Sequence, residues 1–122
     1  MGGYVGLAFA RQFGEKLQGL SMFHSHPFGD TSESKIHRDR GISFINKYGS
    51  EKYIASMLPL LFSIPQRIKF QPEIQKLILS AQKTDANTII NARTAMKNRP
   101  NSALFLEQMK GQLSRLKTPY FD

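Results

Sequence analysis

Cysteine is absent from this sequence of 122 residues, and acidic residues are scarce in it. Without cysteine the chain can form neither a disulfide bond nor a thiolate metal site. Long hydrophobic runs are also missing: the longest, ASMLPLLFSI, has about half the ~20 residues that a membrane-spanning helix needs, and it contains a proline. The first residues lack the basic segment and the cleavage site of a secretory signal. These absences predict a soluble, cytoplasmic protein with no membrane partner.

The scarcity of acidic residues is uneven along the chain. In total, 9 Asp and Glu stand against 17 Lys and Arg, which gives a net charge of +8. Between Arg67 and Lys117, ten basic residues stand against three acidic ones. Such a surface can attract nucleic acid, anionic lipid or an acidic protein. Because no basic run is dense and no aromatic residues are interleaved with it, a solvated basic surface is the favoured interpretation.

The first 70 residues predict a mixture of helices and strands. Residues 5–17 have helical spacing, and LSMFHSH, residues 20–26, is short and apolar like a buried strand. A turn-rich loop then leads to a helix capped by Ser32 or Ser34 and stopped by Gly49. The β-branched and aromatic residues of KYIASMLPLLFSIP predict another strand, with a short buried helix as the alternative.

The last 50 residues predict helices alone, because their apolar residues recur at helical spacing. The three helical stretches are residues 71–84, 85–98 and 101–117, and Asp85 is the candidate N-cap of the second. We therefore expect an α+β fold, or a small α/β one, in which a short sheet carries the histidine strand and helices flank it. A metal-binding part would cover residues 1–70 and a basic helical region residues 71–122, together in one structural unit.

The three histidines of the chain, His24, His26 and His37, fall within 14 positions. In a strand, His24 and His26 would point to the same face, and His37 would lie about one turn into the following helix. Neutral imidazole is the commonest metal ligand, and three protein ligands plus water are typical of catalytic zinc. The alternative is a hydrogen-bonded histidine pair at a strand end, with His37 unrelated on the surface.

The residues between the histidines favour the metal. HSHP, then six residues, Ser34, two residues and position 37 resemble the JAMM motif of the MPN metalloprotease superfamily. Gly29 also resembles a glycine of the RadC-type relatives, and the resemblance covers about residues 5–48. It implies that His24 and His26 bind zinc, that Ser34 stabilises the oxyanion of the tetrahedral intermediate, and that His37 replaces the aspartate that is the family's third ligand. Asp39 is less suited to that place, since two residues along a helix it faces away from His37.

The resemblance also implies a general base, for which these enzymes use a glutamate on an early strand upstream of the histidines. Only 23 residues precede His24, so the first strands of the family fold and this glutamate are missing. Glu15 is the one acid before the motif, and it is either a substitute base or an ordinary surface charge. Asp30 and Glu33 in the loop could approach the metal, although solvation and capping explain them as well.

Three functions are compatible with these features. The first is a JAMM-like zinc metallohydrolase of peptide or isopeptide bonds, in a truncated or inactive form if no base is supplied. The second is a non-catalytic, zinc-containing assembly module of the MPN type, and the third a basic helical protein that binds nucleic acid. A peptide or protein substrate is the expected partner of the first. A sheet that lacks its first strands would have an exposed edge, so we also expect a homodimer or a partner chain that completes the sheet.

Overall fold

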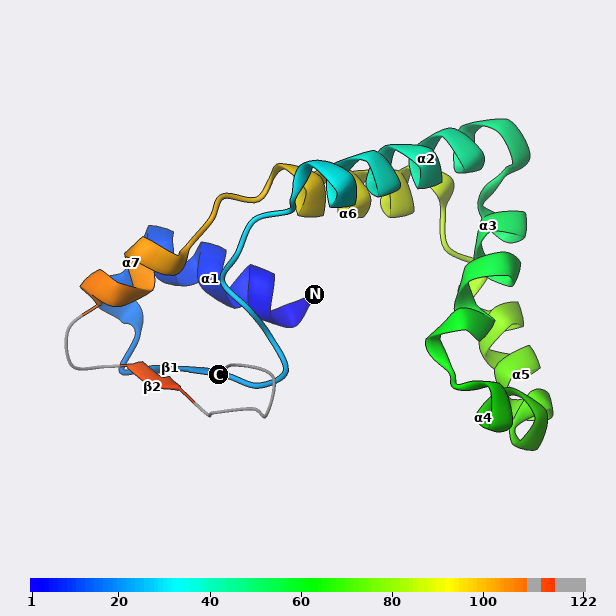
Figure 1. Cartoon of the computed structure of the whole chain (residues 1–122), viewed down its shortest axis with the longest axis horizontal. Coiled ribbons are helices and arrows are strands. Elements are labelled where there is room, and N and C mark those ends of the chain that lie inside the picture. Colours follow the sequence, from blue (N-terminus) through cyan, green and yellow to red (C-terminus); the bar gives the residue numbers. More distant parts are fainter. Residues whose placement is uncertain (110–112, 116–122) are drawn as a thin grey trace. The chain divides into compact units, whose positions relative to one another are not determined.

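The computed structural model describes residues 1–109 and 113–115, which form two compact units (Figure 1). Unit 1 comprises Met1–Asp30 and the described residues from Asn98 onward, and unit 2 comprises Thr31–Lys97. The boundary that the sequence predicts near residue 70 falls inside unit 2. Among the described residues no helix combines the length and the hydropathy that crossing a bilayer requires.

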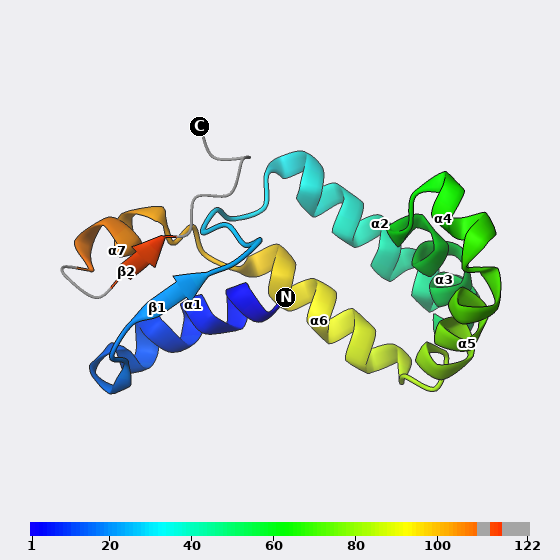
Figure 2. The same ribbon diagram turned by 90° about the horizontal axis from the view of Figure 1, so that it is seen from below.

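Unit 1 is built on one long helix. It contains α1 (Gly2–Phe13), η1 (Gly14–Lys16), β1 (Leu20–Met22), α7 (Ala103–Gln108) and β2 (Leu113–Arg115). Leu7 and Ala10, three positions apart on α1, are its buried apolar side chains among the described residues. β1 runs parallel to β2 over three residues, starting with the pair Leu20 and Leu113 (Figure 2).

Unit 2 is entirely helical. It contains α2 (Ser32–Tyr48), α3 (Ser50–Met57), η2 (Leu58–Leu61), α4 (Ile64–Lys69), α5 (Gln71–Ala81) and α6, which spans Ala86–Asn98 and so ends at the unit boundary. Its buried apolar side chains come from α2, α3 and α5, and they are Ile45, Ile54, Ile74 and Ile78. α2 and α6 lie side by side in both ribbon views (Figures 1 and 2).

The ends of the helices in unit 2 follow from local chemistry. The N-cap of α2 is Thr31 and not Ser32 or Ser34 as predicted, since the Thr31 hydroxyl accepts a hydrogen bond from the Ser34 backbone N–H. Gly49 ends α2 as predicted, with φ 87°, a conformation that suits glycine. Asp85 caps α6 as predicted, since its carboxylate accepts a hydrogen bond from the Thr88 N–H at 3.2 Å.

A buried arginine joins α6 to α2. The side chain of Arg93 donates hydrogen bonds to the backbone oxygens of His37 and Arg38, at 3.0 and 3.2 Å, and to the Tyr53 hydroxyl. The guanidinium lies directly over Gly41, where an added Cβ would clash with it. The absence of a side chain at Gly41 therefore lets α6 place a charged group against the backbone of α2.

The expected α+β or small α/β fold is wrong, because the chain is mostly helical. Helices account for 73% of the described residues, and strand pairing is limited to the three residues of β1 and β2. The predicted histidine strand ends at Met22, before either histidine. The helix predicted over residues 101–117 is correct only for Ala103–Gln108, which form α7, whereas Leu113–Arg115 form the strand β2. Residues 110–112 and 116–117 of that range lie outside the described residues.

The strand predicted over residues 52–65 is also wrong, and most of that range lies in α3 and η2. The two prolines explain why a segment rich in β-formers is helical. Pro59 and Pro65 are the second residues of η2 and α4, in the first turn, where a helix needs no N–H donor and where the fixed φ of proline already fits. The alternative of a short helix is thus the one observed.

Replacing Gly41 by alanine is expected to destabilise unit 2. The new methyl group would displace the Arg93 guanidinium and leave a buried cation without its carbonyl partners, at a cost of about 2 kcal/mol. Chemical denaturation followed by far-UV circular dichroism measures this loss. Gly14→Ala is the control, since nothing lies within 4 Å of its added Cβ and its φ is −57°. Equal stability of the two variants would contradict this role of Gly41.

Candidate metal centre

The histidine-containing segment of unit 1 is a loop and not a strand. Residues 23–31, between β1 and α2, have no regular secondary structure, so the alternation of a strand does not place His24 and His26 on one face. His24 has φ 47°, in the left-handed region that non-glycine residues seldom occupy. Its exposed ring packs edge-on against Phe23, with 4.3 Å between the centroids. A strained residue of this kind points to a constraint beyond simple chain connection.

His26 is held by aromatic neighbours on two sides. Its Nε2 lies 3.2 Å from the hydroxyl of Tyr4 on α1, and its ring stacks on Phe28 with 5.9 Å between the centroids. The other ring nitrogen, Nδ1, is buried and has no hydrogen-bond partner within the described part of the chain. When Nε2 carries the proton and donates it to Tyr4, Nδ1 presents a free lone pair.

Arg99 fixes the remainder of the loop. Its Nη1 donates to the carboxylate of Asp30 at 2.6 Å, and its Nε donates to the backbone oxygen of Phe28 at 3.2 Å. The guanidinium also lies over the Tyr4 ring, 4.0 Å from the centroid. The side chains of Asp30 and Arg99 are only 4% and 11% exposed, so this ion pair is shielded from water. Tyr4, Phe28 and Asp30 are thereby tied to one cation.

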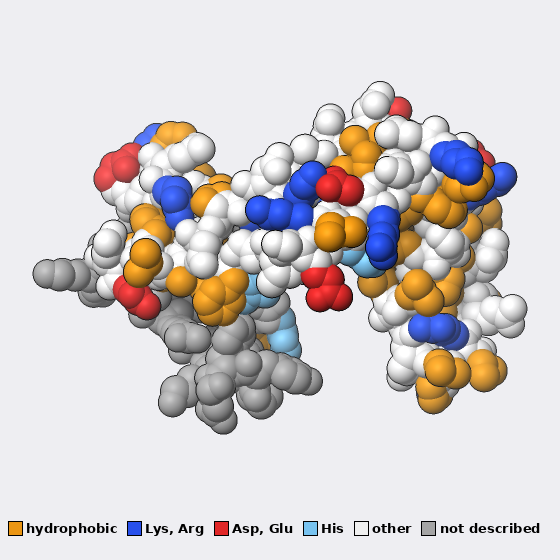
Figure 3. Space-filling model, turned by 45° about the horizontal axis from the view of Figure 1, so that its top comes forward, with side chains coloured by type: hydrophobic (Ala, Val, Ile, Leu, Met, Phe, Trp, Pro, Cys, Tyr) orange, Lys and Arg blue, Asp and Glu red, His pale blue; other side chains and the backbone are white. Residues whose placement is uncertain are grey.

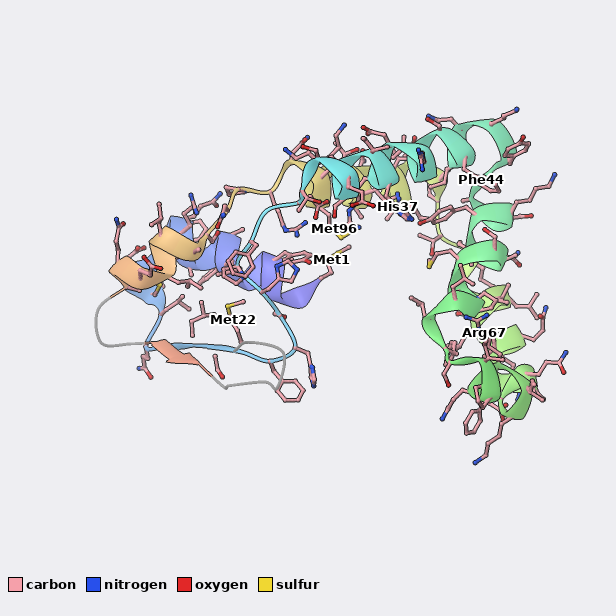
Figure 4. All side chains as sticks on the ribbon, viewed as in Figure 1. Met1, Met22, His37, Phe44, Arg67 and Met96 are labelled. Atoms are coloured by element: carbon pink, nitrogen blue, oxygen red, sulfur yellow. The ribbon has the colours of Figure 1, made fainter. Side chains whose placement is uncertain are left out.

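Ser34 and His37 lie in unit 2, on the exposed first turns of α2. Figure 4 labels His37 there. Ser34 and His37 are three positions apart on the helix, so their side chains lie on the same face. The Ser34 hydroxyl accepts a hydrogen bond from the Thr31 hydroxyl at 3.1 Å, which leaves its own proton available for donation. Asp39, the less favoured alternative ligand, binds Lys97 through both carboxylate oxygens, at 2.7 and 2.8 Å.

The candidate bases occupy different environments. Glu15 lies in η1, exposed to solvent, and Glu33 is exposed in the first turn of α2. The carboxylate of Asp30 is engaged by Arg99. Within the described ranges, no three His, Asp or Glu side chains are grouped so that they could hold one metal ion.

Tyr4, Phe28 and Arg99, which all contact this loop or belong to it, are residues that the sequence did not single out. Tyr4 shares the spacing i, i+3 with the buried Leu7, so a helical projection of α1 places it on the inward face. Arg99 gives no such signal, because it lies 69 residues from Asp30 in a basic region.

No protein-family model matches this sequence, and no curated protein shows significant similarity to it.

Replacing Arg99 by methionine is expected to destabilise unit 1. The substitution keeps the aliphatic part of the side chain and leaves the buried Asp30 carboxylate without this cation, which costs about 3 kcal/mol. Denaturation followed by circular dichroism gives the cost, and proteolysis within residues 23–31 should accelerate. Arg40→Met, at an exposed position of α2, is the matched control and should change stability by about 0.5 kcal/mol or less. A stable Arg99→Met protein with a protease-resistant loop would show that Arg99 does not hold the loop.

Proposed function

We propose that this chain is a zinc-binding module in which His24 and His26 hold the metal, with His37 as the third ligand that the motif implies. The observation that carries the proposal is the unsatisfied ring nitrogen of His26. A buried polar atom without a partner is costly, and a histidine that binds metal through one nitrogen commonly bonds a fixed group through the other. Tyr4 is such a group for Nε2.

The strained backbone of His24 supports the same proposal. A left-handed conformation at a histidine persists where another interaction favours the resulting ring position. Imidazole nitrogen suits zinc at about 2.0–2.1 Å, and an all-imidazole set suits zinc as well as the carboxylate-containing set of the JAMM motif does. A role in holding structure is favoured over catalysis, because the fold that the resemblance implied was wrong and the resemblance now rests on the local motif.

Zinc content is the decisive measurement for this proposal. Protein purified without chelator and supplied with zinc is expected to hold one zinc ion per chain by elemental analysis. His24→Ala and His26→Ala should lose it, whereas His37→Asp should keep it, because aspartate restores the ligand of the family motif. Full zinc retention by His26→Ala would refute the proposed ligand set.

Tyr4→Phe separates metal support from ordinary packing in the same experiment. The variant keeps the aromatic ring that contacts His26 and Arg99 and removes only the hydroxyl. Loss of such a supporting hydrogen bond typically lowers metal affinity about tenfold or more, measured by competition with a chromogenic chelator. A stability change without an affinity change would mean that Tyr4 serves packing alone.

Peptide or isopeptide hydrolysis is the second candidate function, and the hydrogen bonding of Ser34 favours it. Zinc held by protein ligands would act as a Lewis acid and activate water. With its hydroxyl oxygen bonded by Thr31, Ser34 could donate its own proton to the oxyanion of a tetrahedral intermediate. Glu15, the one acid before the histidines, is exposed and would have to serve as a substitute for the missing base.

A fluorogenic isopeptide substrate tests this second function with zinc-loaded protein. Ser34→Ala is expected to lower kcat about 100-fold while zinc content stays unchanged, which is the usual effect of removing one oxyanion donor. Ser32→Ala, two residues earlier and equally exposed in α2, is the matched control and should retain full activity. Equal rates for the two variants would remove Ser34 from the mechanism.

A further inference from the structure

Unit 2 exposes a compact set of large aliphatic side chains, here called the apolar patch. It consists of Leu60 and Leu61 from η2 and Ile64 and Ile68 from α4, whose exposed fractions are 66%, 72%, 70% and 77%. Figure 3 shows hydrophobic side chains over the α4 and α5 end of this unit, with a basic one among them. Soluble proteins normally expose large aliphatic side chains singly and scattered over the surface, whereas here a segment of nine residues exposes four of them.

The backbone that carries the apolar patch is held in place. The Arg67 Nε donates to the Phe62 backbone oxygen at 2.8 Å, and the Arg67 backbone N–H donates to the Ser63 oxygen at 3.0 Å (Figure 4). These bonds fix the turn between η2 and α4. Ile64 and Ile68, four positions apart, point to the same face of α4. The aliphatic side chains are therefore presented to solvent by an ordered turn.

Basic residues accompany the apolar patch. Residues 58–84 contain four of them (Arg67, Lys69, Lys76 and Lys83) against the single acid Glu73, a net charge of +3. Lys69, Lys76 and Lys83 are exposed. Exposed aliphatic side chains and exposed lysines in one segment of the chain are a combination that can bind at the interface of a bilayer with anionic lipids.

We propose that the apolar patch docks on an anionic lipid surface, with Ile64 and Ile68 entering the headgroup region and the neighbouring lysines meeting lipid phosphates and carboxylates. A second copy of the chain would bring two surfaces of the same positive charge together. Nucleic acid would meet the charge but gain nothing from four aliphatic side chains. The proposal departs from the expectation of no membrane partner, which rested on the absence of a spanning segment.

Vesicle co-sedimentation of the full chain tests the proposal. The protein is expected to bind vesicles in which phosphatidylserine is about a third of the lipid, and to bind pure phosphatidylcholine far more weakly. Ile64→Ser with Ile68→Ser should lower the partition coefficient about tenfold or more, since less apolar surface leaves water. Leu104→Ser is the matched control: this leucine is 71% exposed but lies on α7 in unit 1, and its loss should leave binding unchanged.

Two results would overturn the proposal. If the double isoleucine variant binds anionic vesicles as the unaltered chain does, the net charge alone causes binding. If the unaltered chain ignores vesicles but dimerises in sedimentation velocity, and the double variant does not dimerise, the apolar patch is an interface between copies. Circular dichroism confirms that the variants fold, which their exposed positions predict. Because the site lies outside the histidine loop, the outcome is independent of zinc.

Discussion

The fold of unit 2 depends on a charged group buried against a helix backbone. Arg93 is 8% exposed, and its hydrogen bonds go to main-chain oxygens and a tyrosine hydroxyl. A carbonyl oxygen inside a helix has a second lone pair, so α2 can accept these bonds without losing its own. The arrangement needs close approach, which only glycine at position 41 permits. One residue without a side chain thus sets where α6 can lie against α2.

Local signals in the sequence were sufficient to predict most of the helices and several of the residues at which they begin or end. Gly49 and Asp85 act where they were predicted to act, because the conformation of glycine and the capping of N–H groups depend on immediate neighbours. The α2–α6 contact was not predictable in this way. In the sequence, nothing distinguishes Arg93 from a basic residue on the solvent-exposed face of a helix. Its burial depends on Gly41, which lies 52 positions earlier in the chain.

The errors at β1 and at residues 52–65 have a common cause. Short apolar segments fit a buried strand and a buried helix equally well by periodicity, and the decision then rests on tertiary contacts. LSMFHSH pairs only through its first three residues, after which Phe23 and His24 leave the strand. The histidine motif was recognisable at the level of residue spacing. The contact of His26 with Tyr4 was not recognisable in this way, because Tyr4 lies 22 residues earlier on α1 and no residue spacing indicates that the two are close.

The ion pair between Asp30 and Arg99 also has a topological meaning. It joins the two parts of unit 1 beside the points where the chain leaves for unit 2 and returns from it. The ion pair of Asp39 and Lys97 joins the two terminal helices of unit 2. Unit 2 is therefore one continuous stretch of sequence that is inserted between the two parts of unit 1. During synthesis, all of residues 31–97 are added to the chain before Arg99, the partner of Asp30. The inserted unit can therefore fold first, and its neighbouring ends then bring together the two halves of the unit that surrounds it in sequence.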